Sequence, residues 1–368
     1  MNIVVVVDNN YAQYVGVMLT SMFENTADSK KIKVYVIYNE LTDQNKSNLT
    51  DVVKKYDSQI VFINEYYNFN DYYEGPYVSK AAYLKINIPN YLPFDQKYAL
   101  YLDGDIIINC DILEFEKFDI SEHYIAAVND DNTYLASEID KPVEHYFNSG
   151  VMKINLQKWR EENISIKVYE YIISPMNKKN TVDQDPLNVV LGDNWLKLNR
   201  SYNFMPVNHT QIRVPRLIHY AYKDKPWHIL YSGEYKEKFD YYKKLCSWNG
   251  YIQSDLEILN GREIVVFGAS IAGESAYKLL QKEELDVEFF IDSDKKKVGL
   301  KFCNKNIHTV EVLNNLSSQL AIIVPSMSYF MEIKDILKKY CYFPMKTCNK
   351  IFLRSWLEIH SPSSLEFK

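Results

Sequence analysis

Short runs of apolar residues alternate with helical apolar stripes through the first part of the chain. Residues 3–7 and 32–38 form the first two runs, and a shorter run covers residues 60–63. The segments 11–23 and 49–56 lie between them and carry apolar residues three or four positions apart. Because strands covered on both faces are continuously apolar, this alternation predicts a largely parallel sheet between two helical layers, an α/β fold.

The alternation continues to about residue 191. We predict a helix over residues 79–88 that ends before Pro89, and two apolar strands within residues 98–109. Residues 195–250 are rich in aromatic side chains and are predicted to be irregular. Further strands are expected at 125–128 and 147–154, and further helices at 156–159 and 183–191.

A second α/β pattern begins after Gly261. A strand at 263–267 leads into the turn 268–273, Gly-Ala-Ser-Ile-Ala-Gly, which opens a helix, and Asp292 ends the next strand. This arrangement is typical of a Rossmann-like unit, but Ser270 stands at the second glycine of the dinucleotide-binding pattern, where a pyrophosphate needs close approach. Packing, acceptor binding and nucleotide binding therefore all remain open for this unit, and we assign it no catalysis.

The two patterns divide the chain of 368 residues, and this length also favours two domains. We predict a first domain over residues 1–250 that carries the chemistry. A smaller Rossmann-like accessory domain is expected over residues 261–345, and a polar tail over residues 346–368.

Charge and cysteine usage narrow the possible partners and the compartment. Lys and Arg total 42 against 48 Asp and Glu, which argues against a nucleic-acid partner because backbone binding needs clustered cations. Five dispersed cysteines without a C-x-x-C pair are typical of reduced thiols in a cytoplasmic protein. We expect neither a signal peptide nor a membrane span, which needs an apolar run of ~20 residues, so only peripheral membrane contact stays open.

Asp103-Gly104-Asp105 places two carboxylates directly after an apolar strand. Ligands of open α/β sheets bind beyond such strand ends, and two neighbouring carboxylates are costly there unless a cation neutralises them. Oxygen ligands favour Mg²⁺ or Mn²⁺, and His219, which follows another apolar stretch, would move the choice toward Mn²⁺. For the isolated motif, a loop of capping side chains and a hydrogen-bonded structural histidine remain the alternatives.

Four motifs occur in one order along the chain. They are Tyr101-Leu102-Asp103-Gly104-Asp105, Tyr146-Phe147-Asn148-Ser149-Gly150-Val151, Asp183-Gln184-Asp185 with Asn188, and His219-Tyr220 followed by Lys225-Pro226-Trp227. In this order they resemble the retaining glycosyltransferases of family 8, which include bacterial lipopolysaccharide galactosyl- and glucosyltransferases and glycogenin. The resemblance covers about residues 1–230, and Asp8 and Tyr11 after the first strand belong to it.

This resemblance implies a GT-A catalytic domain, a UDP-sugar donor and a Mn²⁺ ion, with Mg²⁺ as the alternative. By motif, it implies Asp103, Asp105 and His219 as metal ligands and Lys225 at the diphosphate. It implies donor contacts from Asp8 and Asn10 at the uridine end, from Asn148, Asp183 and Gln184 in the sugar pocket, and, as further candidates, from Tyr11, Gly104, Asp130, Ser149 and Asp185.

Two positions depart from the family pattern. In family members the helix that matches residues 79–88 carries an Arg that reaches the donor, and the matching position here is Tyr83, with Lys80 as a substitute. Tyr222 stands where the family often has a glycine, three residues after the metal-binding histidine. The contacts to the diphosphate and the acceptor are therefore the least determined part of the predicted site.

The predicted reaction moves a hexose, galactose before glucose, from the UDP-sugar to a glycan or a glycoprotein-linked sugar. A double displacement needs a carboxylate nucleophile, whereas the family match gives Gln184, an amide, with Asp183 and Asp130 as the other catalytic candidates. We therefore expect front-face attack. Two alternatives stay open: glycogenin-like self-glucosylation, which the 31 tyrosines permit, and a UDP-sugar sensor without turnover.

Overall fold

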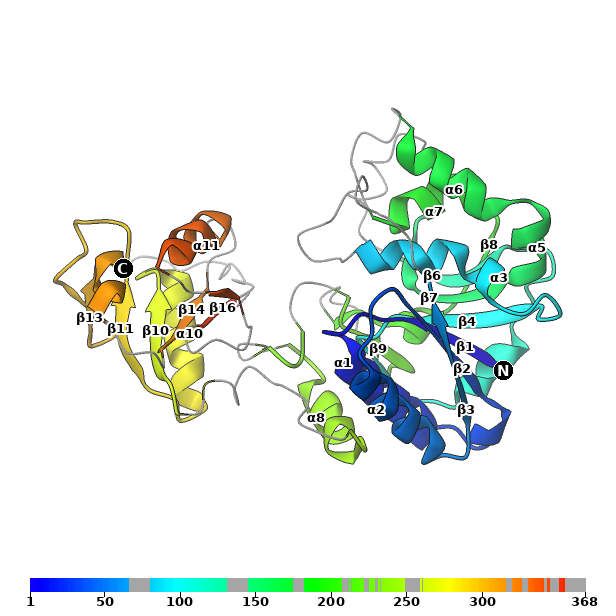
Figure 1. Cartoon of the computed structure of the whole chain (residues 1–368), viewed down its shortest axis with the longest axis horizontal. Coiled ribbons are helices and arrows are strands. Elements are labelled where there is room, and N and C mark those ends of the chain that lie inside the picture. Colours follow the sequence, from blue (N-terminus) through cyan, green and yellow to red (C-terminus); the bar gives the residue numbers. More distant parts are fainter. Residues whose placement is uncertain are drawn as a thin grey trace. The chain divides into compact units, whose positions relative to one another are not determined.

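The structure is a computed structural model of the chain, and it separates into two compact units (Figure 1). The first unit comprises Met1–Ala221 and Glu237–Ile252, and the second comprises Tyr222–Lys236 and Gln253–Lys368. The domain limits expected from the sequence stay a prediction. The described residues are 1–65, 80–130, 145–174, 182–206, 212, 214–221, 225–228, 231, 233–248, 259, 261–315, 320–325, 330–340, 343–344 and 351–354.

A mixed sheet forms the centre of the first unit, with the order β3-β2-β1-β4-β7-β6-β8 in the described part of the chain. The strands β3, β2, β1 and β4 are mutually parallel, as the alternation predicted. Strand β7 runs antiparallel between β4 and β6, so the sheet is not parallel throughout. The bounds are β1 Asn2–Val6, β2 Lys33–Tyr38, β3 Gln59–Asn64, β4 Tyr98–Leu102, β6 Ile125–Asn129, β7 Phe147–Asn155 and β8 Trp195–Lys197.

Helices cover both faces of this sheet. Figure 1 shows α1 (Ala12–Glu24) and α2 (Asp43–Lys54) along one face and the group of α3, α5, α6 and α7 on the other. Alternate residues of β1 explain the two layers, because Ile3 and Val5 pack with the first pair while Val4 packs with the second group. The second group comprises η2 Lys80–Asn87, α3 Ile88–Tyr91, α5 Leu156–Glu161, α6 Ile164–Ile173 and α7 Gln184–Leu191.

Two expectations for the first unit were wrong. The helical path does not stop before Pro89, because the 3₁₀ helix η2 leads directly into α3, whose first turn contains this proline. A proline is tolerated there since the first-turn N–H groups have no intrahelical partner. Residues 195–250 are not irregular throughout, and their strands of three residues are too short to show a period in the sequence. The region contains β8, η4 Arg200–Asn203, β9 Leu217–His219 and α8 Lys236–Leu245.

A small sheet beside the main one brings distant segments together. After β4 the chain turns, and β5 (Ile106–Ile108) leaves the main sheet to pair antiparallel with β9. Ile106 is paired with His219 in this register. The turn between β4 and β5 therefore lies beside the end of β9, which fixes the place of the candidate site.

The second unit has its own parallel sheet, ordered β12-β13-β11-β10-β14-β16-β15 in the described residues, with β12 antiparallel to β13. Helix α10 (Ile271–Lys282) packs on one face through Ala276 and Leu280, and α11 (Phe330–Lys339) packs on the other. Strand β16 falls within the expected tail, so the sheet extends past residue 345. The bounds are β10 Glu263–Phe267, β11 Val287–Ile291, β12 Lys301–Phe302, β13 Lys305–His308, β14 Leu320–Val324, β15 Phe343–Pro344 and β16 Ile351–Arg354. Among the described residues, this unit also contains the 3₁₀ helix η6 Val310–Asn315, and the first unit contains η1 Ser29–Lys31 and η3 Ile112–Lys117.

Side chains of the second unit hold the glycine turn, residues 268–273, in place. Asp292 accepts hydrogen bonds from the Ala269 N–H at 2.9 Å and from Lys297 Nζ at 3.0 Å. Ser270 caps α10, and a Cβ on Gly273 would overlap the carbonyl oxygen of Gly268. Close packing of the turn against the start of α10 therefore explains why residue 273 is a glycine, and no bound ligand is needed to explain it.

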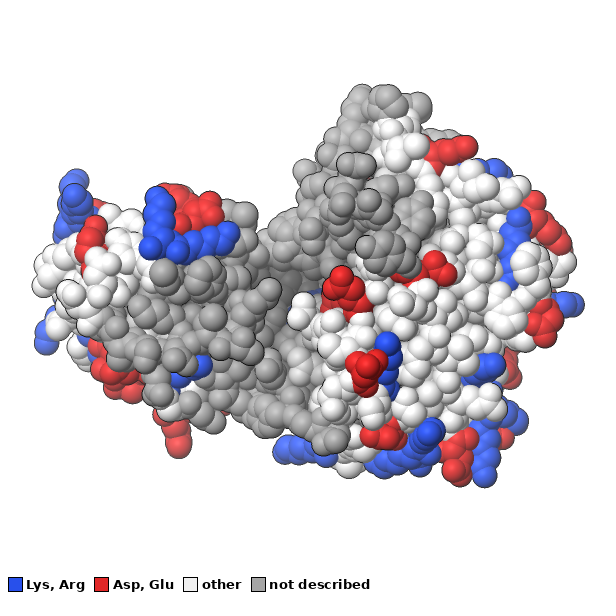
Figure 2. Space-filling model, in the orientation of Figure 1, with Lys and Arg blue, Asp and Glu red and all other residues white. Residues whose placement is uncertain are grey.

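Surface charge is mixed over the described residues. Figure 2 shows basic and acidic side chains interspersed over the described surface of the face it presents. Among the described helices, none is long and apolar enough to cross a bilayer.

Replacing Gly273 by alanine is expected to destabilise the second unit by at least ~2 kcal/mol, because the new Cβ meets backbone that cannot move aside. Urea unfolding followed by circular dichroism measures the loss. Ser275→Ala, at a half-buried position of the same helix where the side chain bonds the Ile271 carbonyl, is the control and should change stability little. Equal stability of Gly273→Ala and the wild type would contradict the packing described.

Candidate active site

The turn between β4 and β5 carries both acidic residues of the DGD motif. Asp103 follows the last residue of β4, and its N–H donates to the carbonyl of Gly150 in the neighbouring β7 at 2.8 Å. Asp105 precedes β5, and its carbonyl accepts the N–H of Tyr220 at 3.0 Å. Main-chain hydrogen bonds to two different neighbours therefore hold the two carboxylates at one place.

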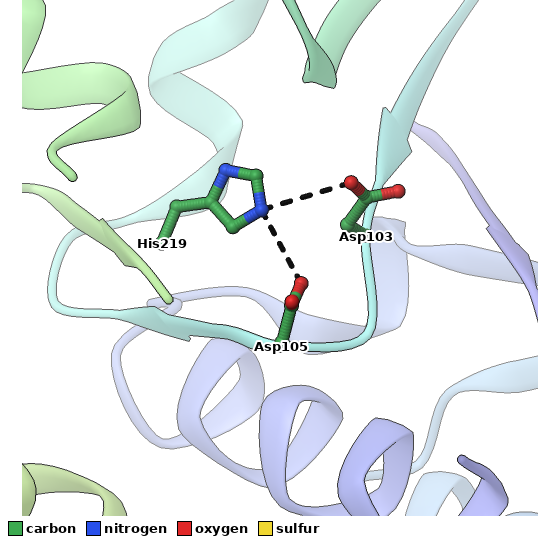
Figure 3. A group of neighbouring side chains, drawn as sticks. All are labelled: Asp103, Asp105 and His219. Atoms are coloured by element: carbon green, nitrogen blue, oxygen red, sulfur yellow. Dashed lines mark ion pairs between the residues drawn. The ribbon is translucent and has the colours of Figure 1, made fainter. Parts of the chain in front are cut away.

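His219 completes a group of three. Its Nε2 lies 3.6 Å from Asp103 Oδ2 and 3.3 Å from Asp105 Oδ1, and Figure 3 shows the three side chains pointing toward one another. One ligand atom from each residue lies within 4.8 Å of the others. His219 is 2% exposed and Asp105 is 9% exposed, so water screens the charge of the Asp105 carboxylate poorly. We call these three residues the triad.

Gly150 provides the space that the triad occupies. A Cβ at this position would lie 2.7 Å from Asp103 Oδ2 and closer still to Cε1 of His219. The Asn-Ser-Gly sequence therefore has a steric reason, since any side chain at residue 150 would displace two members of the triad. Gly104 similarly lets the turn approach α1, where a Cβ would lie 2.7 Å from Val15 Cγ2.

A network of amide groups lies beside the triad. The Asn148 Nδ2 and the Gln184 Nε2 each donate to Asp130 Oδ2 at 3.2 Å. The Gln184 Oε1 accepts the N–H of Ser149 at 3.0 Å. Four of the predicted sugar-pocket residues therefore form one hydrogen-bonded set.

Asp183 faces this set and a buried lysine instead of capping its own helix α7. Its Oδ2 lies 2.9 Å from Lys85 Nζ and accepts from Ser149 Oγ at 2.7 Å. Lys85 also lies 3.4 Å from Asp103 Oδ1 and is 4% exposed. Burial lowers the pKa of Lys85, but the nearby Asp103 and Asp183 outweigh it and the net pKa is raised, so this side chain is cationic and offsets part of the acidic charge.

Sequence reasoning missed Lys85. The sequence predicts that Tyr83 or Lys80 is the side chain of the helix at residues 79–88 that reaches the donor. Tyr83 is instead a core residue that is 1% exposed, while the side chain of Lys80 lies outside the described residues. One feature of the sequence could have indicated a buried functional lysine: Lys85 stands between Leu84 and Ile86 in a segment that is otherwise largely apolar.

Buried phenols donate to two of the carboxylates. Tyr101 donates to Asp103, and Tyr146 donates to Asp185. Burial first and then the neighbouring carboxylate raise the pKa of both phenols, which therefore stay protonated and act as donors. Asp185 is thus engaged at the start of α7, and its predicted contact with the donor stays a prediction.

The predicted uridine-end residues lie at the start of α1. Asp8 Oδ1 accepts the N–H groups of Asn10 and Tyr11, each at 2.9 Å, which shapes the turn after β1. Asn10 is exposed, whereas the ring of Tyr11 lies against the turn of the triad, because a Cβ on Gly104 would be 3.6 Å from Tyr11 Cδ1. Burial first and then Asp105 raise the pKa of Tyr11. Lys225 is buried and belongs to the second unit by its place in the chain, and its contact with a diphosphate stays a prediction.

Asn203 is a second residue that the sequence did not reveal. Its Oδ1 lies 2.8 Å from His219 Nδ1, and its Nδ2 donates to Asn148 Oδ1 at 2.9 Å. It lies in the segment that was expected to be irregular, so no pattern could point to it.

Comparison with known proteins identifies the family. The family model described as glycosyl transferase family 8 matches residues 2–230, more than half of the chain. The chain belongs to glycosyltransferase family 8. It is therefore a transferase that acts on a nucleotide-sugar donor and a sugar acceptor. A second family model, described as C2185-like, N-terminal, matches residues 260–347.

Two relatives are similar over most of the matched region, and a solved structure shows the fold. A putative glycosyltransferase of Haemophilus influenzae is 31% identical over 250 residues, covering 62% of this chain and 73% of the relative. General stress protein A of Bacillus subtilis is 28% identical over 271 residues, covering 68% and 95%. The galactosyltransferase LgtC, solved with donor and acceptor sugar analogues, superimposes with a TM-score of 0.60 at 23% identity, covering 68% of this chain and 98% of LgtC. The first unit thus has the GT-A fold, as predicted.

Replacing Lys85 by methionine is expected to lower the free energy of unfolding by about 3 kcal/mol, because Asp183 loses its buried cation. Since the pKa of Lys85 is raised, the stability it contributes is fully present below the ordinary value of about 10.4 and is lost only above it. Urea unfolding should therefore show the same loss at pH 7 and pH 9.

Two further variants control this experiment. The exposed Lys54→Met should leave stability close to that of the wild type. Adding Asp183→Asn to Lys85→Met should restore part of the loss, because the uncompensated charge is removed. A double variant less stable than Lys85→Met alone would contradict the proposed charge pairing.

Proposed function

We propose that this family 8 enzyme is a Mn²⁺-dependent retaining hexosyltransferase that uses a UDP-sugar, with galactose as the favoured hexose and glucose next. The acceptor is a glycan or a glycoprotein-linked sugar. The observation that carries the proposal is the juxtaposition of the triad with the amide and carboxylate set around Gln184. A diphosphate and a hexose need these two environments side by side.

The triad fits a divalent cation. Two carboxylate oxygens and one imidazole nitrogen form a donor set of the kind that Mn²⁺ accepts, whereas all-oxygen sets suit Mg²⁺ better. The space left by Gly150 supports the same assignment, because the three ligand atoms converge only where a Cβ is missing. A bound cation would neutralise charge that builds on the departing diphosphate.

The other donor contacts are proposed from the order of the elements. Asp8, Asn10 and Tyr11 would hold the uridine end, and Lys225 would contact the diphosphate. The hexose hydroxyls would meet the hydrogen-bonded set of Asp130, Asn148, Ser149 and Gln184. These groups offer both donors and acceptors, which suits the hydroxyl groups of a sugar.

Front-face attack is supported by the engagement of the nearby carboxylates. Asp183 is paired with Lys85, Asp185 accepts from Tyr146, and Asp130 accepts from two amides. The acceptor oxygen would bond to the anomeric carbon on the side from which UDP leaves, and its proton would pass to the departing phosphate oxygen. An active-site glutamine variant of LgtC, which superimposes with a TM-score of 0.61 at 22% identity, makes Gln184 a reasonable sugar-pocket residue.

Removing the metal is the first test of the proposed reaction. EDTA should abolish release of UDP from UDP-galactose or UDP-glucose, and added Mn²⁺ should restore it. Asp103→Asn should reduce this activity by at least ~100-fold, because loss of a mere supporting partner of a metal ligand already costs 10–100-fold. Asp95→Asn, an exposed position before β4, is the control and should keep full activity.

The same assay separates the alternatives. A sensor would bind UDP-galactose and release no UDP. A self-glucosylating protein would gain hexose units on its own chain when no acceptor is present, which intact-mass spectrometry detects. Either outcome would contradict the proposed transfer to a separate acceptor.

Gln184→Ala tests the front-face route. Turnover should fall by less than ~100-fold, since loss of a covalent nucleophile costs about 10⁴-fold or more. Gln157→Ala, an exposed glutamine on α5, is the matched control. Mass spectrometry of rapidly quenched reactions would refute the route if it showed a hexose attached to Asp183 or Asp185.

A further inference from the structure

We infer that Asn203 is a positioning residue, which sets the imidazole of His219 for the metal and links it through Asn148 to Asp130 and Gln184. The inference rests on the proposed function, because it takes the triad as the metal site. Asn203 would touch neither metal nor sugar and would act only through these neighbours.

Main-chain pairing fixes the place of Asn203. It is the last residue of η4 and is 1% exposed. The next residue, Phe204, donates its N–H to Leu217 at 2.9 Å and accepts that of His219 at 2.8 Å. Asn203 and His219 are therefore held side by side by backbone hydrogen bonds, whatever their side chains do.

The orientation of Asn148 is determined by groups that have only one possible role. The N–H of Gly150 donates to Asn148 Oδ1 at 3.0 Å, and a main-chain N–H can only donate. At the other end of the amide, Nδ2 faces the carboxylate of Asp130 at 3.2 Å. A flipped Asn148 would set donor against donor, so its Oδ1 must face Gly150.

The orientation of Asn203 and the tautomer of His219 follow. Because Asn148 Oδ1 is an acceptor, the group of Asn203 that faces it at 2.9 Å must be Nδ2. The Oδ1 of Asn203 then faces His219 Nδ1 at 2.8 Å, and this nitrogen must carry a proton. Nε2, the nitrogen beside Asp103 and Asp105, is left to offer its lone pair to a cation.

The same chain of hydrogen bonds reaches the sugar pocket. Asn148 and Gln184 donate to the same oxygen of Asp130. A shift of Asn203 would therefore disturb a metal ligand on one side and the sugar-facing amides on the other. Two substitutions of Asn203 can separate these effects.

Asn203→Leu removes both hydrogen bonds and keeps the branched, four-heavy-atom shape of the side chain, although the two methyl groups are bulkier than the amide oxygen and nitrogen. Asn203→Asp keeps an acceptor for His219 but sets an oxygen against Asn148 Oδ1. Mn²⁺ binding, measured from the electron paramagnetic resonance signal of free Mn²⁺, should weaken by ~10–100-fold in Asn203→Leu. In Asn203→Asp the Mn²⁺ affinity should stay close to that of the wild type, while kcat for UDP release from UDP-galactose falls by about tenfold or more.

Controls and a second readout keep the test decisive. Asn199→Leu removes a cap at the start of the same η4 helix and should leave Mn²⁺ affinity unchanged. Thermal melting shows that each variant is folded. Long-range ¹H–¹⁵N correlation spectra of the metal-free wild type should show His219 protonated at Nδ1.

Three results would overturn the inference. Wild-type Mn²⁺ affinity in folded Asn203→Leu would do so, and so would a His219 ring protonated at Nε2 alone. Both would leave the proposed function standing. A wild type that binds no Mn²⁺ would instead refute the proposed function and this inference together.

Discussion

The antiparallel pairing of β5 with β9 is the constraint on which the candidate site depends. It brings His219 to a turn that is set by β4 far earlier in the chain. The insertion of β7 beside β4 adds the second condition, because it places Gly150 against the same turn. Neither pairing involves a side chain of the triad, so the scaffold is made by the backbone and the chemistry is added to it.

Several carboxylates of the site have a buried cation or a hydrogen-bond donor beside them. Lys85 lies between Asp103 and Asp183, and the phenols of Tyr101 and Tyr146 stay protonated beside their acids. The carboxylates are thereby oriented as well as neutralised in part. What is left is an acidic place at the triad and, next to it, a place lined by amide groups and the Asp130 carboxylate. Under the proposed function the first would take a metal-bound diphosphate and the second the hydroxyl groups of a sugar.

The sequence predicted the family, the GT-A fold and the segments that carry the site, and the comparisons confirm the first two. The direction of β7 was not predictable, because the apolar pattern of a buried strand is the same whether it runs parallel or antiparallel to its neighbours. Lys85 was missed since a helical stripe does not say which polar side chain points inward, and Asn203 was missed because its segment has no period. The roles assigned to individual residues stay predictions, since close packing alone does not reveal what a site binds.

Gly150 has only a hydrogen atom as its side chain, and every other residue type would place a Cβ at this position, against Asp103 and His219. Gly150 is therefore a simple sequence marker for comparing chains of this family. Under the proposed function, a copy of this enzyme that keeps both aspartates and the histidine but has gained any side chain at this place could no longer close the triad around an ion. Such a copy would be expected to have exchanged catalysis for another task, even though its acidic motif still looked intact.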